Sequence, residues 1–111
     1  MQTIKEIEKR MQYIQLKIDG ENRDAERERN KSAAFLQGGD NDNAALHATA
    51  ATKHEQDSQM LQQEMSDLTN QTQQLQTQIA ELGKQKETIT AEKDSELQRI
   101  DSEVARIQGS F

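Results

Sequence analysis

Two histidines are the side chains of this sequence whose spacing first suggests chemistry. His47 and His54 lie seven residues apart. Two histidines that bind one metal ion from a single helix lie four residues apart, and neither is accompanied by a Cys or by a Glu three residues before it. We therefore expect no metal site. Two interpretations remain open, a half-solvated helix face and a pH-sensitive layer in which a histidine beside Glu21 or Glu28 titrates near neutrality.

Nothing in the sequence predicts catalysis. Gly38 and Gly39 are followed by acidic residues, which would repel the phosphate that a glycine-rich loop binds. A rod of two helices is also expected to lack a concave pocket large enough for a ligand. We expect a protein that is not an enzyme and has no cofactor.

A leucine repeat raises the possibility of a DNA-binding zipper. Four leucines recur every seven residues, namely Leu61, Leu68, Leu75 and Leu82. A basic zipper needs a helix rich in Lys and Arg directly upstream, whereas Lys53 is the one basic residue within 44–60. The net charge of −6 also opposes binding to phosphates. We expect no nucleic-acid partner.

The composition favours long helices over a compact globule. The 111 residues suffice for one domain at most, and a hydrophobic fraction of 32% with a mean hydropathy of −1.06 is low for a globular core. Disorder is the competing interpretation, because 31% of the residues are charged and aromatic residues are few. The periodicity described below decides for helices, and the absence of Pro allows them to be long. No Cys is present for disulfides or thiolate metal sites.

Membrane insertion and secretion are not expected. No apolar run approaches the roughly 18 residues that span a bilayer, and residues 1–8 lack the apolar region of a signal peptide. The sequence predicts a soluble protein of the cytoplasm or of an assembled particle.

The first coiled-coil helix is predicted over residues 1–37. Thr3 and Glu6 have the spacing of a capping box, which starts a helix. Apolar residues then recur at intervals of three and four, as in a heptad stripe: Ile4, Ile7, Met11, Ile14 and Ile18. A mixed-charge stretch over 19–31 fits a solvated helix with pairs of opposite charge.

Residues 38–43 carry the one turn signal, because glycines that end a helix adjoin Asp and Asn residues that begin the next. The second helix is predicted from about residue 43 to about residue 108, with residues 44–75 paired with the first helix. If the chain folds back at the turn, Ile18 faces Leu61 and Ile14 faces Met65. The predicted pairing core comprises Ile4, Ile7, Met11, Ile14, Ile18, Leu61, Met65, Leu68 and Leu75.

The overhanging residues 76–111 continue the stripe with no internal partner, and we predict that they form a coiled-coil association segment. Its apolar residues are Ile79, Leu82, Ile89, Leu97, Ile100, Val104, Ile107 and Phe111. Lys86 and Lys93 also lie on the stripe. Two consecutive intervals of four, from Ile89 to Lys93 and on to Leu97, form a stutter that locally unwinds the supercoil. Gly83 is expected to remain helical.

The predicted fold is thus an all-α, long antiparallel helical hairpin with coiled-coil heptads, a short first helix and a very long second helix. We expect a non-enzymatic structural or assembly protein that pairs helices within a large complex, such as a viral particle or a secretion apparatus. The alternatives are a helical adaptor or chaperone that clasps client proteins, and a regulator that sequesters another coiled coil. The expected partners are proteins, either further copies of this chain or other subunits.

Overall fold

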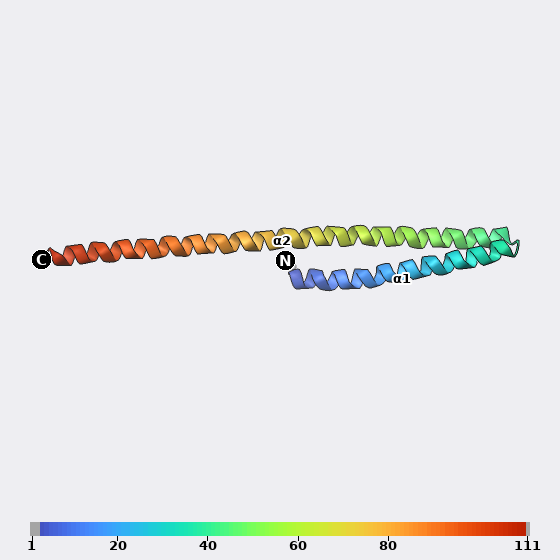
Figure 1. Cartoon of the computed structure of the whole chain (residues 1–111), viewed down its shortest axis with the longest axis horizontal. Coiled ribbons are helices and arrows are strands. Elements are labelled where there is room, and N and C mark those ends of the chain that lie inside the picture. Colours follow the sequence, from blue (N-terminus) through green and yellow to red (C-terminus); the bar gives the residue numbers. More distant parts are fainter. Residues whose placement is uncertain (1–2, 111) are drawn as a thin grey trace. The chain divides into compact units, whose positions relative to one another are not determined.

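The computed structural model describes residues 3–110, which form two helices and no strand. Helix α1 spans Ile4–Gln37 and helix α2 spans Asn41–Gly109 (Figure 1). The prediction of an all-helical hairpin is confirmed. Residues 3–73 form one compact unit, the hairpin, and residues 74–110 belong to a second unit.

The start of α1 follows from its capping box. The Thr3 hydroxyl accepts a hydrogen bond from the Glu6 amide at 3.2 Å, and the Glu6 carboxylate accepts one from the Thr3 amide at 3.4 Å. These two bonds satisfy amides that have no partner within the helix. The sequence prediction of this cap is confirmed.

The end of α1 is set by Gly39, whose φ of +81° lies in the left-handed region that favours glycine. Its amide donates to the carbonyl of Leu36 at 3.1 Å, and the next amide, that of Asp40, donates to the carbonyl of Phe35 at 2.9 Å. This pair of bonds is the Schellman arrangement, which satisfies two carbonyls at the helix end. Gly38 itself keeps the right-handed conformation, so the left-handed residue is the second glycine of the pair.

The same Asp40 also begins α2. Its carboxylate accepts hydrogen bonds from the backbone amide of Asn43 at 3.2 Å and from that residue's side-chain amide at 2.7 Å. Because Asp40 caps α2 from this position, the helix starts at Asn41, two residues earlier than expected. Within residues 3–110 the chain reverses at this turn alone, as predicted.

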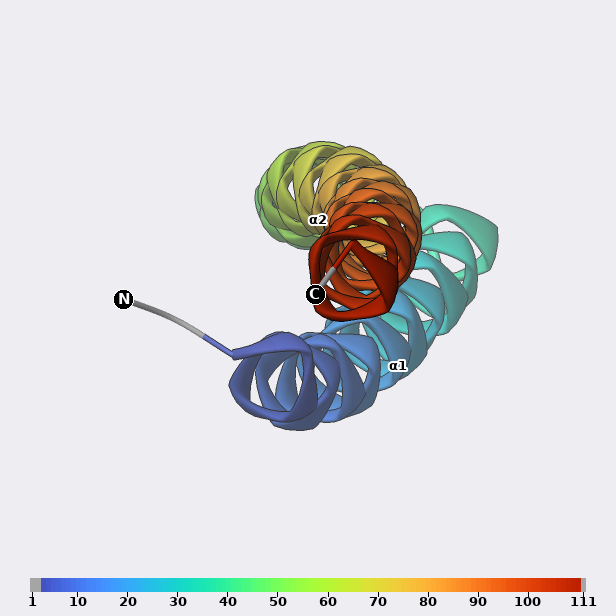
Figure 2. The ribbon, with the colours of Figure 1, turned by 90° about the vertical axis from the view of Figure 1, so that its left-hand side faces the viewer.

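The two helices of the hairpin lie side by side in opposite directions (Figure 1). In the view along the helices, α1 does not run parallel to the green part of α2, so the axes of the two helices are inclined to each other (Figure 2). All nine residues of the predicted pairing core are buried or half-buried. Those buried are Ile7, Ile14, Ile18 and Leu68, and those half-buried are Ile4, Met11, Leu61, Met65 and Leu75.

Small side chains make up the remaining core of the hairpin. The buried residues beyond the predicted set are Ala25, Ala44, Ala51 and Ser58. Ala44 is 6% exposed and Ala51 is 0% exposed, so the Ala-rich stretch over residues 44–52 of α2 contributes two positions to this core. Side chains of this size allow two helix axes to approach closely.

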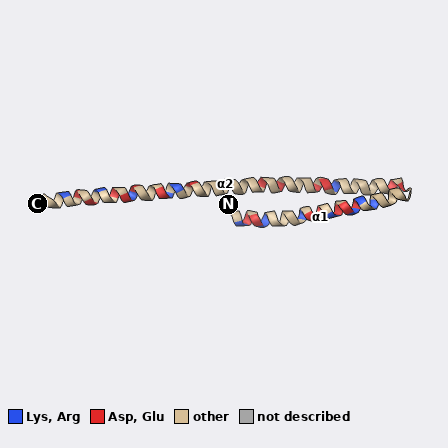
Figure 3. Cartoon of the chain, viewed as in Figure 1, with Lys and Arg blue, Asp and Glu red and all other residues tan. Residues whose placement is uncertain are grey.

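In the second unit, α2 continues as unbroken helix through Gly83, as expected. Every described residue from 76 to 110 is exposed. Charged residues of both signs alternate along this part, whereas residues 59–78 are nearly free of charge (Figure 3). Neither helix is apolar over a stretch long enough to cross a bilayer.

Candidate functional site

The first candidate site is the apolar stripe of the second unit, hereafter the association stripe. Its described members are Ile79, Leu82, Ile89, Leu97, Ile100, Val104 and Ile107. Their exposed fractions lie between 43% for Ile100 and 65% for Ile89, whereas the hairpin isoleucines Ile7 and Ile14 are 1% and 2% exposed. Together with Lys86 and Lys93 they recur at intervals of three and four residues, which places these side chains along one side of the helix. Phe111, also predicted for this segment, lies outside the described residues.

Ion pairs accompany the association stripe on the same helix. Arg99 donates to Glu96 at 2.6 Å, and Arg106 donates to Glu103 at 2.6 Å. The bond to Glu96 raises the pKa of Arg99 above its ordinary value. Each pair joins residues three apart, so these interactions lie within the helix.

The second candidate site is a pair of histidine–glutamate contacts across the hairpin. Nδ1 of His54 lies 2.6 Å from Oε2 of Glu21, and Nδ1 of His47 lies 2.5 Å from Oε2 of Glu28. The structure therefore contains the histidine–glutamate contacts on which one of the two open interpretations, the pH-sensitive layer, depends. The Phe35 ring stacks on His47, with ring centroids 5.3 Å apart and planes 4° from parallel. This stack was not predicted, because it depends on how the chain turns between the two residues.

These contacts change two pKa values in opposite directions. The hydrogen bond to Glu21 raises the pKa of His54 above 6.5; partial desolvation opposes this, and the charges of Glu21, Asp24 and Glu28 add to it. The hydrogen bond from His47 lowers the pKa of Glu28 below 4.5. The contact at His54 therefore favours the imidazolium form, and the contact at Glu28 favours the carboxylate.

The stability of the hairpin should consequently be greatest between pH 4.5 and pH 6.5. Stabilisation from His54 is complete below 6.5 and is lost as the pH rises through its raised pKa. Stabilisation from Glu28 is complete above 4.5 and is lost as the pH falls through its lowered pKa. The variant His54→Gln should show a smaller fall in Tm than the parent chain between mildly acidic and mildly alkaline buffer, measured by circular dichroism. An identical fall in both chains would contradict this assignment.

Other polar contacts hold the two helices near the predicted register. Arg29 donates to Glu55 at 2.6 Å, which lowers the pKa of the Glu55 carboxyl, and Arg10 pairs with Glu64. In the interior the Ser58 hydroxyl donates to Asn22 at 2.7 Å. In the predicted register Ser58 faces Glu21, and its observed partner Asn22 is the next residue along the chain. Solvent screens the exposed ion pairs, so they contribute little to the free energy of unfolding. Their main effect is to favour this alignment of the two helices.

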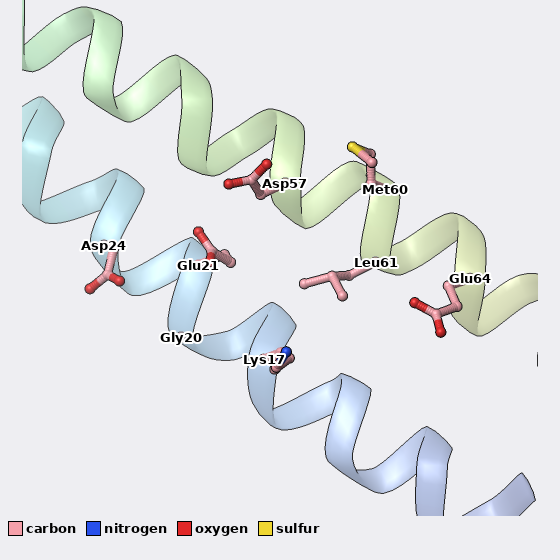
Figure 4. A pocket seen from close by; sticks show the side chains of 8 residues that line it. All are labelled: Lys17, Gly20, Glu21, Asp24, Asp57, Met60, Leu61 and Glu64. Atoms are coloured by element: carbon pink, nitrogen blue, oxygen red, sulfur yellow. The ribbon is translucent and has the colours of Figure 1, made fainter.

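The third candidate site is a hollow on the seam of the hairpin, about 500 Å³ in volume and open to solvent (Figure 4). Volumes of about 460 and 350 Å³ also occur on the surface of α1 alone and of α2 alone, so this open hollow is not an enclosed ligand pocket. Gly20 lines the hollow, and a Cβ added there would meet no atom within 4 Å. Four carboxylates line the hollow with one basic residue, Lys17; they are Glu21, Asp24, Asp57 and Glu64. Within residues 3–110 no group of three or more potential ligands is placed to hold a metal ion.

Comparison of the chain with protein families, curated proteins and solved structures found no significant match.

Proposed function

We propose that this chain is a structural or assembly protein that works by pairing helices with other proteins in a larger complex. The hairpin over residues 3–73 supplies a folded part with its own core. The association stripe supplies the surface for a partner. The observation that carries this proposal is the exposure of seven large apolar residues in a row along one helix.

The free energy available from this surface favours association. Complete burial of one large apolar side chain contributes about 1.5–3 kcal/mol. Because the seven side chains are already partly shielded by their own helix, their burial would contribute on the order of 10 kcal/mol before the entropic cost of association. An exposed row of large apolar residues, here interrupted by Lys86 and Lys93, marks an interaction surface more often than a solvated one.

The geometry of the association stripe specifies the kind of partner. A row with intervals of three and four residues fits the matching row of another helix, as in a coiled coil. An extended peptide would instead require an exposed sheet edge, and residues 3–110 form no sheet. The proposed partner therefore presents an amphipathic helix.

Removal of the association stripe tests this proposal. A chain that ends after Gln76 should remain helical, because it retains the whole hairpin over residues 3–73. It should also lose its ability to associate, since the seven exposed side chains are gone. Circular dichroism measures the helicity and light scattering measures the mass.

The matched control is the full chain with Lys84→Glu, which changes an exposed charge on the outer face of the same helix. We expect this variant to keep the mass of the parent chain. A truncated chain with the same oligomeric state as the intact chain would assign association to the hairpin and refute the proposal.

A further inference from the structure

We propose that the partner of the association stripe is the same stripe of a second copy of this chain, running antiparallel, with the two-fold axis at Lys93. This inference rests on the proposed function and names the partner. It is carried by the symmetry of the stripe and by the charges on and beside it.

The stripe reads the same in both directions from Lys93. When Lys86 is counted with the seven apolar members, the stripe positions lie four, seven, eleven and fourteen residues away on either side. An antiparallel second copy therefore forms four kinds of facing layers around the axis: Ile89 with Leu97, Lys86 with Ile100, Leu82 with Val104, and Ile79 with Ile107. Three of these four layers are wholly apolar.

The stutter selects this one antiparallel register. A regular stripe with intervals of three and four would match its reversed copy at many positions along the helix. Here the consecutive intervals of four at Ile89, Lys93 and Leu97 unwind the supercoil locally. Both helices must unwind at the same layer, and in an antiparallel pair this happens only if the two copies of Lys93 meet.

A parallel pair in register would also align the stutters, but its charges oppose it. Lys86 would face Lys86 of the second copy, and Lys93 would face its own counterpart. Glu96 would also lie beside Asp101 of the second copy along the edge of the stripe, and like charges at such flanking positions are destabilising.

The antiparallel pair relieves most of this repulsion. Lys86 then packs beside Ile100 of the second copy, where the acidic Asp101 and Glu103 are within reach of its ammonium group. The two copies of Lys93 still meet at the axis, but Glu92 and Glu96 from both copies border that layer. The lysines of one half of the stripe thus meet the acidic flank of the other half.

The hairpin shows how flanking residues meet when this chain pairs helices in opposite directions. Arg10 directly precedes the core residue Met11, and its partner Glu64 directly precedes the core residue Met65. The same geometry in the proposed dimer brings Gln85, which precedes Lys86, to Glu96 of the second copy. The side-chain amide of Gln85 then donates a hydrogen bond to the Glu96 carboxylate of the second copy, so two like charges do not meet at this position.

Distances between spin labels on the full chain test the arrangement. The sequence has no Cys, so Ala80→Cys and Arg106→Cys each provide a single labelling site, and both positions are exposed in the structure. In the antiparallel dimer, position 80 faces position 106 of the second copy. Two labels at position 80 should therefore be separated by about 39 Å along the helix axis, at 1.5 Å per residue.

A mixture of the two labelled chains should add a short distance, from pairs of positions 80 and 106 on opposite chains. A label at Lys93→Cys should give a short distance between identical sites, which locates the axis. Circular dichroism verifies that each labelled chain is as helical as the parent.

A short distance between two labels at position 80 would indicate a parallel pair and overturn the inference. So would the absence of any coupling between chains, which would exclude a second copy as the partner. These two results test the antiparallel dimer alone. The proposed function is tested separately by the truncation experiment, where it is refuted if the shortened chain keeps the oligomeric state of the intact chain.

Discussion

Replacement of Ile14 by Ala is expected to lower the free energy of unfolding by about 2–5 kcal/mol, the usual cost of removing a large aliphatic side chain from a packed core. Ile14 is 2% exposed and lies in the middle of the apolar part of α1. A hairpin of two helices has few other layers to compensate for the loss. Urea unfolding followed by circular dichroism gives this free energy.

Leu16→Ala is the matched control, because Leu16 is two residues away on the same helix and is 69% exposed. This variant should change the free energy of unfolding by less than about 1 kcal/mol, as is usual for surface substitutions. Equal losses in the two variants would contradict the assignment of Ile14 to the helix interface.

The double replacement Lys86→Ile and Lys93→Ile should have a comparably large effect in the opposite direction. Each substitution places an aliphatic side chain on the association stripe, where burial contributes about 1.5–3 kcal/mol. The midpoint of thermal unfolding should rise, and the number of chains in the assembly should increase where more helices are needed to cover the wider apolar surface. Calorimetry and light scattering measure the two quantities.

Lys84→Ile makes the same chemical change on the outer face of the helix and should not strengthen association. A double variant less stable than the parent chain would show that the two lysines form specific ion pairs whose loss outweighs the apolar gain. In the proposed dimer such pairs would involve the acidic residues beside the axis.

The sequence was sufficient where structure depends on local chemistry. Thr3 and Glu6 predicted the start of α1, and the glycines before Asp40 predicted the turn. The intervals between apolar residues predicted nine core positions, of which four are buried and five are half-buried. These signals work because capping, left-handed backbone conformations and helical periodicity each involve residues a few positions apart.

The features that sequence reasoning missed depend on how the two helices meet. The hollow beside Gly20 is lined by residues of both helices, so it needs both in place. The burial of Ala51 and the stacking of Phe35 on His47 likewise need both helices in place. The histidine–glutamate contacts were anticipated because the turn fixes an approximate register, which brings Glu21 and Glu28 within reach of the histidines.

The mass of the intact chain in solution is the most direct test of association through residues 76–110. Sedimentation equilibrium over a wide range of concentration measures this mass without any substitution. The proposed dimer predicts twice the 12.6 kDa of the single chain at high concentration, with dissociation on dilution. A mass of 12.6 kDa at every concentration would contradict it.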